Sequence, residues 1–449
     1  MTAPTAAPSG FQHPIDLRPG QPMLRWSSRA HSLDEIEREL AKIWARPPTA
    51  IPGGEDGERH VAARTSVLNL VVIARHPEIG TRAAGTIAEL TGRHPSRTLI
   101  VSSTDPDGPS WLDAQIQAFC VIPREDAAET CGEMIYLSAG GEAGRHLEAL
   151  VAPLLVHDLP VTLWWPGEPP FSSPWSRHLI DMADHLVVDG STWSGNGLSR
   201  LSEMAGIASK HLAISDFALI RQSRWRDAIA ATFDVPEFTS FLHSIRRIAV
   251  TYATHDELGD PNGTNVVKPV YHVGWLASRL GMHVESTLTP IGHRASGHGG
   301  HGTRHEVSGR PEGRSARPTR PVAGHGSAAA PVPGGFDALL RHGTTEVDVV
   351  LRPRLSGLPS GTTLRVELLA ERRGSELRAD VTAEAETVRC RVWRDGVDAL
   401  ERRFNAARRD EVSLLAEAIE STGDDPVEKA TIRMAAQVAV APAHEGGIG

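Results

Sequence analysis

Four histidines in one glycine-rich stretch have the loose spacing of metal ligands: His293, His298, His301 and His305. Imidazole nitrogen is a common ligand of Zn²⁺. Here glycines separate the histidines and no carboxylate is fixed nearby, so the pattern predicts only adventitious affinity for Zn²⁺ or Ni²⁺. We therefore expect no structural or catalytic metal site.

A candidate phosphate site lies in TGRHPSRTLIV (91–101), which places Arg93, His94 and Arg97 around a predicted helix-to-strand turn. Guanidinium groups bind phosphate through paired hydrogen bonds. The same residues could contact an acidic partner surface. A solvated turn whose cations favour the carboxyl end of a helix explains them equally well.

A dinucleotide fingerprint is only partly present in AGGEAG (139–144), which follows a predicted strand and opens a predicted helix. Gly141 and Gly144 fit the second and third glycines of G-x-G-x-x-G, but Ala139 replaces the first. The next strand ends in two tryptophans where the ribose-binding acid is expected, and Glu168 comes only after a Pro-Gly turn. A plain helix start after a tight turn explains the glycines as well.

Two adjacent tryptophans end a predicted strand in PVTLWWPGEPPF (160–171). Their side chains must point to opposite faces of the sheet, and Pro166 ends the strand because it cannot donate the next ladder hydrogen bond. The loop beyond it, at the carboxyl edge of a parallel sheet, is expected to be stiff, exposed and suited to a protein partner. The candidate partner-binding residues are Trp164, Trp165, Pro166, Glu168 and Phe171. Alternatively, both indoles fill the core.

A second candidate contact patch lies in RQSRWRD (221–227), where Arg221, Arg224 and Trp225 fall within about one helical turn. These residues could bind the same partner, or they could form a surface packed by cation–π contacts.

Several catalytic motifs are missing from the sequence. It contains no Walker A loop, no G-x-S-x-G elbow, no H-E-x-x-H and no C-x-x-C. The sequence thus nominates no nucleophile with its base and we expect no cofactor, but these absences leave a pair of catalytic carboxylates open.

The elements that must position these residues alternate between strand and helix from residue 63 to 190. Buried, strand-like runs at 63–74, 97–103, 133–138, 160–165 and 184–190 alternate with amphipathic stretches such as 79–92, 144–156 and 174–183. The segment 110–122 alternates polar and apolar residues and is expected to be an antiparallel or edge strand. This order predicts an α/β fold with a mostly parallel sheet and flanking helices.

The second half of the chain predicts a helical connecting region, a linker and a C-terminal α+β domain. Period-two runs between 345 and 396 indicate an antiparallel meander, and two helices follow it. The expected organisation is a disordered tail (1–30), an α/β domain (31–215), a mainly helical region (216–291), a disordered His/Arg/Gly/Pro-rich linker (292–335) and the α+β domain (336–449).

Composition excludes several classes of function. The net charge of −9 and pI near 6.2 argue against general affinity for nucleic acid or anionic membranes. No apolar run is long enough to span a bilayer, and the start of the chain lacks a signal-peptide pattern. The three cysteines, Cys120, Cys131 and Cys390, have no zinc-like spacing, so we expect reduced thiols in a cytoplasmic protein.

Five segments in one order carry a resemblance to a known family: ARTSVLNLVVIA, RHPSRTLIV, HDLPVTLWWPGEPPF, RWRDAIAATFD and GWLASRLG. They resemble the glucose-6-phosphate dehydrogenase assembly proteins, OpcA, from about residue 60 to 283 and again from about 340 onward. The insert at 292–335 has no counterpart in that resemblance, and no catalytic residue is carried over.

The resemblance implies a non-catalytic assembly factor and allosteric activator. Such a protein binds glucose-6-phosphate dehydrogenase and promotes its active oligomer in the oxidative pentose phosphate pathway. Two alternatives stay open: a sugar-phosphate- or nucleotide-binding enzyme that uses the carboxyl edge of the sheet, and a scaffold for metal or nucleic acid that uses the linker.

Overall fold

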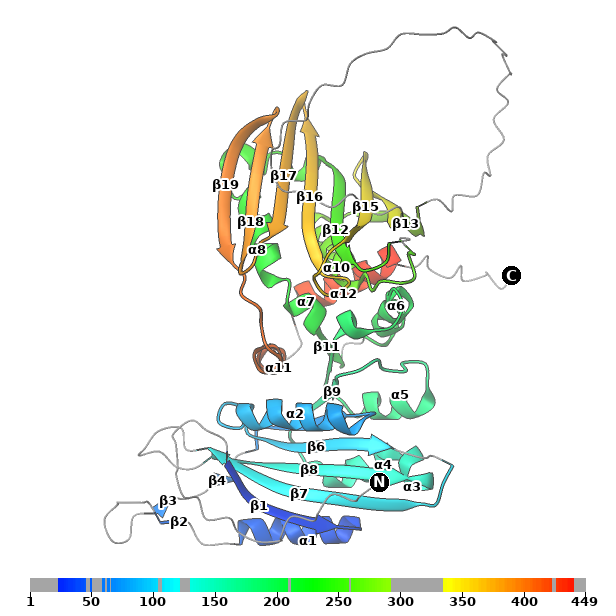
Figure 1. The fold of residues 1–449 in the computed structure, drawn as a ribbon, viewed down its shortest axis with the longest axis vertical. Helices are drawn as coiled ribbons and strands as arrows, with labels where there is room; N and C mark the ends of the chain where they lie inside the picture. Colours follow the sequence, from blue (N-terminus) through cyan, green and yellow to red (C-terminus); the bar gives the residue numbers. More distant parts are fainter. Residues whose placement is uncertain are drawn as a thin grey trace, which may run out of the picture.

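The computed structural model forms two lobes stacked along the long axis, each built around one sheet (Figure 1). It describes residues 23–45, 49–50, 59–60, 63–64, 66–103, 107–121, 130–208, 211–257, 260–291, 334–421 and 425–439. The predictions for residues 1–22 and for the linker residues 292–333, including the four linker histidines, lie outside this part of the chain.

The first lobe contains the expected mostly parallel sheet, with the strand order β1-β7-β8-β6-β5-β9-β10-β11. Its strands are β1 (Met23–Ala30), β5 (Leu68–Ile73), β6 (Ser96–Ser103), β7 (Trp111–Val121), β8 (Thr130–Gly140), β9 (Val161–Trp165), β10 (His185–Val188) and β11 (Ala213–Asp216), and a two-residue strand, β4 (Ala63–Arg64), pairs with β8. Strands β5, β6 and β8 to β11 run parallel, whereas β7 runs antiparallel to both of its neighbours, β1 and β8. Residues 23–30, expected in a disordered tail, therefore form an edge strand instead.

The order in which strands are added to this sheet reverses between β5 and β9, although the strands stay parallel. The chain begins the parallel part at β5, adds β6 and β8 on one side, and returns to add β9, β10 and β11 on the other. Ligands of such doubly wound sheets bind beyond the carboxyl ends of the strands at this switch point. The fold thus nominates the ends of β5, β9 and β10 as a site.

Helices cover both faces of the first sheet. Helix α2 (Pro77–Leu90) and the distant α11 (Glu411–Glu420) share one buried cluster with Leu70, Trp164 and Val187. On the other face lie α1 (Leu33–Trp44), whose N-cap is Ser32, and α5 (Pro174–Asp181). The single helix predicted at 144–156 is wrong, because His146 leaves helical geometry and divides it into α3 (Gly141–Arg145), α4 (Leu147–Val151) and a 3-10 turn.

The second lobe is a mixed sheet with the order β13-β14-β15-β12-β16-β17-β18-β19. Its strands are β12 (Ile245–Thr254), β13 (His283–Pro290), β14 (Phe336–His342), β15 (Thr345–Leu355), β16 (Thr363–Arg372), β17 (Ser375–Ala383), β18 (Thr387–Arg394) and β19 (Val397–Asn405). The meander predicted between 345 and 396 is confirmed for β16 to β18, whereas β15 is separated from β16 by β12, to which it runs parallel. The segment 216–291, expected to be mainly helical, also supplies β12, which pairs with β15 and β16 at the centre of this sheet.

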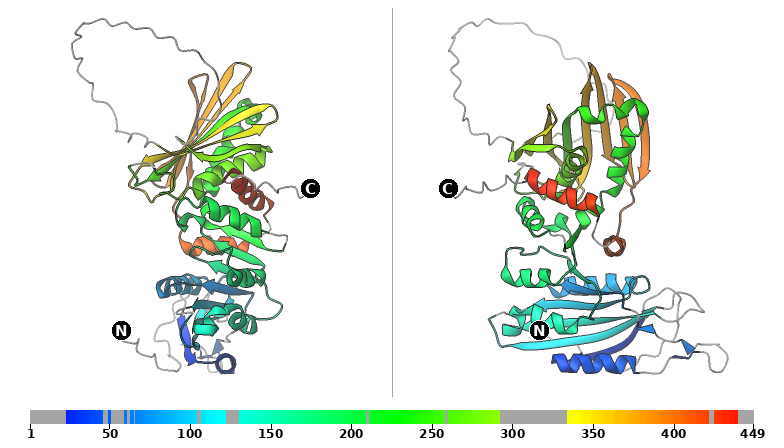
Figure 2. Two further views of the ribbon diagram at one scale, coloured as in Figure 1. Left: turned by 90° about the vertical axis from the view of Figure 1, so that its right-hand side faces the viewer. Right: turned by 180° about the vertical axis from the view of Figure 1, so that it is seen from behind.

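Helices α8 (Ser223–Phe233), α10 (Val267–Leu280) and α12 (Pro426–Ala439) lie on one side of this sheet (Figure 2). Inward-facing residues such as Val250, Val349, Val366 and Val381 join them in the larger core cluster. No described helix covers the opposite face, which we call the open face, and its side chains are largely charged. It includes Arg365, Glu367, Arg378, Asp380, Arg391 and Trp393.

The prediction of three reduced thiols is wrong. Cys120 of β7 and Cys131 of β8 are direct partners in the antiparallel register, with Cα atoms 4.0 Å apart, and they form a disulfide. Cys390 is buried with a free thiol, 3.0 Å from the Thr232 hydroxyl. Among the described helices, none has the length and apolar character needed to cross a membrane.

Candidate functional site

Trp164 and Trp165 point to opposite faces of the sheet, but neither is available at the surface. Both are fully buried, and Pro166 and Phe171 are buried as well. Trp165 packs 5.5 Å from the ring of Trp175, and Trp164 lies 6.2 Å from the ring of Phe217. The expectation of an exposed aromatic tip is therefore wrong, because the loop folds back onto the lobe.

Glu168, the acid of this loop, is held by contacts within the chain. Its carboxylate accepts hydrogen bonds from the backbone N–H and hydroxyl of Ser194, at 3.0 and 2.6 Å, and from Arg200 Nε at 2.8 Å. Partial burial alone would raise its pKa, but these donors lower the pKa of Glu168 to about 2. The charge is therefore already compensated.

The predicted phosphate cluster does not converge on one point. Arg93 and His94 both face Glu420 of α11, at 2.5 and 3.0 Å. Arg97 lies in β6, where its Nε donates to Glu133 at 2.6 Å and its Nη1 donates to the Leu154 carbonyl. Arg97 is therefore part of a buried ion pair inside the sheet.

The patch predicted at 221–227 is divided as well. The predicted helix is interrupted between α7 (Phe217–Ile220) and α8, so the side chains of this patch point in different directions. Trp225 is buried 5.3 Å from the ring of His272, and Arg224 pairs with Asp227 at the surface. Arg221 alone turns toward the carboxyl edge of the first sheet, where it meets Asp189.

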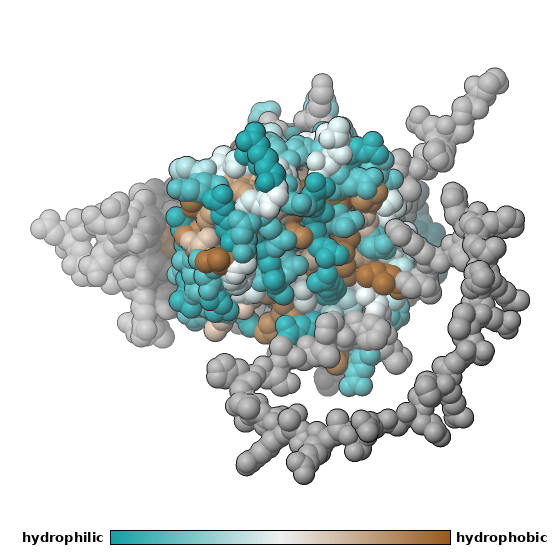
Figure 3. Space-filling view, turned by 90° about the horizontal axis from the view of Figure 1, so that it is seen from above, coloured by the Kyte–Doolittle hydropathy of each residue, from teal (hydrophilic) through white to brown (hydrophobic). Residues whose placement is uncertain are grey.

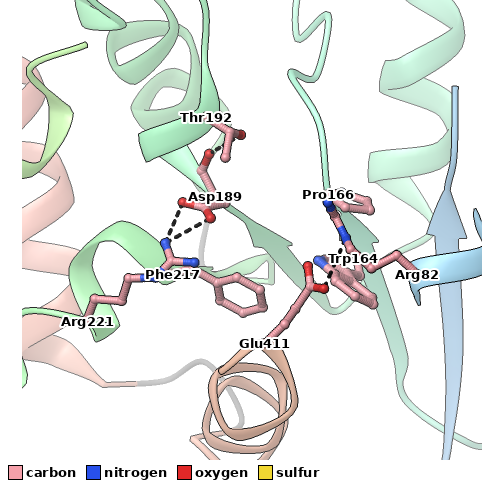
Figure 4. A pocket seen from close by; sticks show the side chains of 8 residues that line it. All are labelled: Arg82, Trp164, Pro166, Asp189, Thr192, Phe217, Arg221 and Glu411. Atoms are coloured by element: carbon pink, nitrogen blue, oxygen red, sulfur yellow. Dashed lines mark hydrogen bonds and ion pairs between the residues drawn. The ribbon is translucent and has the colours of Figure 1, made fainter. Parts of the chain in front are cut away.

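Residues from several elements enclose a pocket of about 260 Å³ at this edge (Figure 4). It lies beside the switch point, past the ends of β9 and β10, and α2, α7 and α11 complete its walls. Its lining is Arg82, Trp164, Pro166, Asp189, Thr192, Phe217, Arg221 and Glu411. Three predicted partner-binding residues, Trp164, Pro166 and Arg221, are thus brought together, but in a pocket and not on a protein-binding surface.

Ion pairs organise the two sides of this pocket. Arg221 Nη1 donates to both carboxylate oxygens of Asp189, at 2.9 and 2.8 Å. Arg82 Nε lies 3.1 Å from Glu411 Oε2. Between them, the buried Nε1 of Trp164 has no hydrogen-bond partner within the described residues.

Asp216, at the end of β11, supports the pocket from behind. It is fully buried and accepts hydrogen bonds from Tyr271 Oη at 2.7 Å, Gly190 N at 2.9 Å and Ala218 N at 2.7 Å. Burial, followed by the charge of Asp189, raises the pKa of Asp216 to about 6. A Cβ at Gly190 would lie 2.5 Å from the Asp216 carboxylate, so the contact requires glycine there.

The partial dinucleotide motif has a structural explanation. Gly141 has φ +57°, and a Cβ there would approach the Gly108 carbonyl to 2.6 Å. A Cβ at Gly144 would meet the Ser103 hydroxyl, also at 2.6 Å. The true switch-point turn, between β5 and α2, carries Pro77 in the first helical turn, which removes one N–H from the helix start. These features favour packing over pyrophosphate binding.

Sequence reasoning missed most of the pocket. Asp189 and Asp216 each follow or end a buried parallel strand, and that signal could have nominated them. Glu411 gave no such signal, because only the tertiary fold brings α11 to this edge. Within the described residues, no group of three or more His, Cys, Asp or Glu side chains could hold a metal ion.

The fold and pocket define a two-lobed protein with a doubly wound α/β lobe and a second lobe with one open sheet face. Two family models match it in order: the glucose-6-phosphate dehydrogenase subunit N-terminal domain at residues 87–205 and the corresponding C-terminal domain at 212–431. The chain belongs to this family, OpcA, and the resemblance inferred from the sequence is confirmed.

One relative is a Synechococcus elongatus protein whose name, OxPP cycle protein OpcA, is provisional. It is 24% identical over 192 residues, a region that covers 42% of this chain and 40% of the relative. The alignment thus spans less than half of either protein.

Similar solved structures include the aldose–aldose oxidoreductase of Caulobacter crescentus, with 12% identity and a TM-score of 0.39 over 83% of this chain and 97% of that one. The transcriptional regulator Gal80p of Kluyveromyces lactis has 8% identity and a TM-score of 0.42 over 84% and 88%. These similarities are too low to carry an argument about function.

Proposed function

We propose that this protein is a non-catalytic assembly factor and allosteric activator that binds glucose-6-phosphate dehydrogenase and promotes its active oligomer. The observation that carries the proposal is the ordered match to both domains of the glucose-6-phosphate dehydrogenase subunit family. The name of the Synechococcus relative supports a role in the oxidative pentose phosphate cycle.

The chemistry of the carboxyl edge supports a non-catalytic role. The carboxylates that line the pocket are paired with Arg221 or Arg82, and Asp216 is held by three donors. No cysteine, serine or lysine nucleophile lines the pocket with a base. An activator needs only higher affinity for the active state of the dehydrogenase, which shifts its population.

The open face of the second lobe is our candidate for the dehydrogenase contact, because the predicted aromatic loop is buried. Trp393 is partly exposed on this face, with the guanidinium carbons of Arg378 and Arg391 at 5.4 and 5.5 Å from its ring centre. Tryptophan and arginine dominate the binding energy of protein interfaces. Seen from above, the end of the second lobe is mostly hydrophilic, with small separate hydrophobic patches (Figure 3).

The test is to mix the purified protein with purified glucose-6-phosphate dehydrogenase. We expect co-elution, a larger dehydrogenase oligomer and a left-shifted substrate saturation curve. An unchanged curve without co-elution rejects the proposal.

The contact face is tested by Trp393→Ala, for which we expect binding to weaken on the order of 30-fold. Trp111→Ala is the matched control, since Trp111 is also exposed, at 41%, but lies on the first lobe. Equal binding by both variants would place the contact elsewhere without affecting the proposed activity.

The pocket supports one alternative function: an enzyme that acts on a sugar phosphate at the carboxyl edge of the first sheet. Turnover of such a compound by the isolated protein, lost in an Arg221→Gln variant, would establish it.

A further inference from the structure

The unused hydrogen-bonding capacity of the pocket consists mainly of donors. The Asp189 carboxylate already accepts from Arg221 and Ser191, and Glu411 is paired with Arg82. In contrast, Trp164 Nε1 is buried without an acceptor, and an indole nitrogen can only donate.

The two arginines also keep donors in reserve. Arg82 approaches Glu411 through Nε, and Arg221 uses Nη1 for Asp189 and Ser191. The Arg82 side chain is 56% exposed and that of Arg221 is 30% exposed, so both guanidinium groups can donate to a ligand as well. A ligand that meets these groups must present several acceptor oxygens.

A third cationic side chain, Lys268, is close enough to Arg221 for their charges to interact. Lys268 of α10 is half-buried, and burial followed by the charge of Arg221 lowers the pKa of its ammonium group. Asp189 and Asp216 oppose this effect, yet the like charges of Lys268 and Arg221 still repel each other. An anion in the pocket would relieve that repulsion.

The walls and size of the pocket restrict the ligand further. Trp164, Pro166 and Phe217 provide apolar surface beside the arginines (Figure 4). A volume of about 260 Å³ lies just below the usual range for ligand pockets, roughly 300–1,000 Å³. This space suits one phosphorylated ring and is too small for a dinucleotide.

The geometry points to a binding site for a sugar monophosphate, whose phosphate oxygens accept from Arg82, Arg221 and Trp164 Nε1. Trp164 and Phe217, which are 0% and 1% exposed, close the inner end of the pocket behind the ligand. Because Arg82 and Glu411 belong to distant parts of the sequence, the bound phosphate also reinforces the contact between α2 and α11. This site goes beyond the proposed function and does not depend on the dehydrogenase.

The test is isothermal titration of the full chain, at low ionic strength, with three probes: a hexose 6-phosphate, the same hexose without phosphate, and inorganic phosphate. We expect the hexose phosphate to bind, inorganic phosphate to bind more weakly and the free hexose to give no signal. Arg82→Gln should weaken hexose phosphate binding about 10- to 100-fold, since it removes a charged hydrogen-bond donor.

Arg93→Gln is the matched control. Arg93 lies in the turn that follows α2 and pairs with Glu420 at the other end of α11, away from the pocket. Arg93→Gln also removes an arginine–glutamate pair to α11, but neither Arg93 nor Glu420 lines the pocket, so the affinity should be unchanged. If Arg82→Gln does not fold, Trp164→Phe removes the N–H donor and keeps an aromatic ring.

Three results would overturn the inference. They are no binding of hexose phosphate by the wild-type protein at millimolar concentration, equal loss of binding in Arg82→Gln and Arg93→Gln, and equal affinity for hexose phosphate and inorganic phosphate. Capture of the dehydrogenase is measured separately, so failure here is distinguishable from failure of the proposed function.

Discussion

Arg82 of α2 and Glu411 of α11 form an ion pair of 3.1 Å that joins the N-terminal lobe to a helix from the C-terminal end of the chain. Helix α11 follows β19 of the second sheet, yet it packs on the first sheet beside α2. The first lobe is therefore completed by residues that lie beyond the second lobe in sequence. The two lobes should consequently unfold together.

Shortening Leu414 to alanine tests this completion of the first lobe. Leu414 is fully buried in the cluster that contains Trp164 and Leu70. Leu414→Ala should lower the free energy of unfolding by about 2–5 kcal/mol, because it removes apolar contacts and leaves a cavity. Urea denaturation followed by tryptophan fluorescence measures the change. Leu414→Met conserves volume and should cost less than about 1.5 kcal/mol, and equal losses in the two variants would contradict the packing argument.

The pKa of Asp216 predicts a specific pH dependence of stability. Burial and Asp189 raise it from 3.8 to about 6 in the folded protein, so the folded state binds the proton more tightly than the unfolded state. The stabilising effect of this protonation is complete below the unfolded pKa and is lost as pH rises through about 6. A shift of about two pKa units corresponds to roughly 3 kcal/mol.

Asp216→Asn removes that titration. We expect the free energy of unfolding of the wild-type protein to fall, relative to the variant, between about pH 4 and pH 6 and to level off above. Glu428, whose pKa burial and Asp425 raise to about 7, adds a slope of the same sign. Asp216 is a smaller cause of that rise, so Asp216→Asn also reduces the Glu428 contribution slightly, in the same direction. Parallel stability curves for the two proteins would show that Asp216 does not titrate in this window.

Sequence patterns predicted the parallel sheet of the first lobe because each strand is a continuous apolar run and each helix has its own start and stop signals. The strand-like run at 63–74, which contains β5, and the amphipathic stretch at 79–92, which overlaps α2, are examples. The patterns also predicted the meander, where side chains alternate between core and solvent. In these parts local periodicity and tertiary environment agree.

Other features depend on contacts that local patterns do not encode. The prolines that end β9 predicted an exposed loop with Trp164 and Phe171 at its tip. In the structure, later residues such as Trp193 cover this loop. The Cys120–Cys131 disulfide depends on the register of β7 and β8. The pocket needed Arg82, Asp189 and Glu411 to meet, and spacing along the chain contains no signal for that.

The Arg97–Glu133 pair is predicted to be structural. Glu133 is 1% exposed and Arg97 is 9% exposed, and their charged atoms are 2.6 Å apart between neighbouring strands. Glu133→Gln leaves the guanidinium buried beside a neutral amide, so the free energy of unfolding should fall by about 3–5 kcal/mol. Thermal or urea unfolding at neutral pH measures it.

Replacing both partners separates this structural role from phosphate binding. In Arg97→Met with Glu133→Leu no charge remains buried, so we expect the double variant to regain most of the stability lost in Glu133→Gln. Because Arg97 faces Glu133 and the Leu154 carbonyl, not the pocket, the double variant should bind hexose phosphate as the wild type does. If the double variant folds but binds hexose phosphate more weakly, Arg97 contributes to phosphate binding and its role is not only structural.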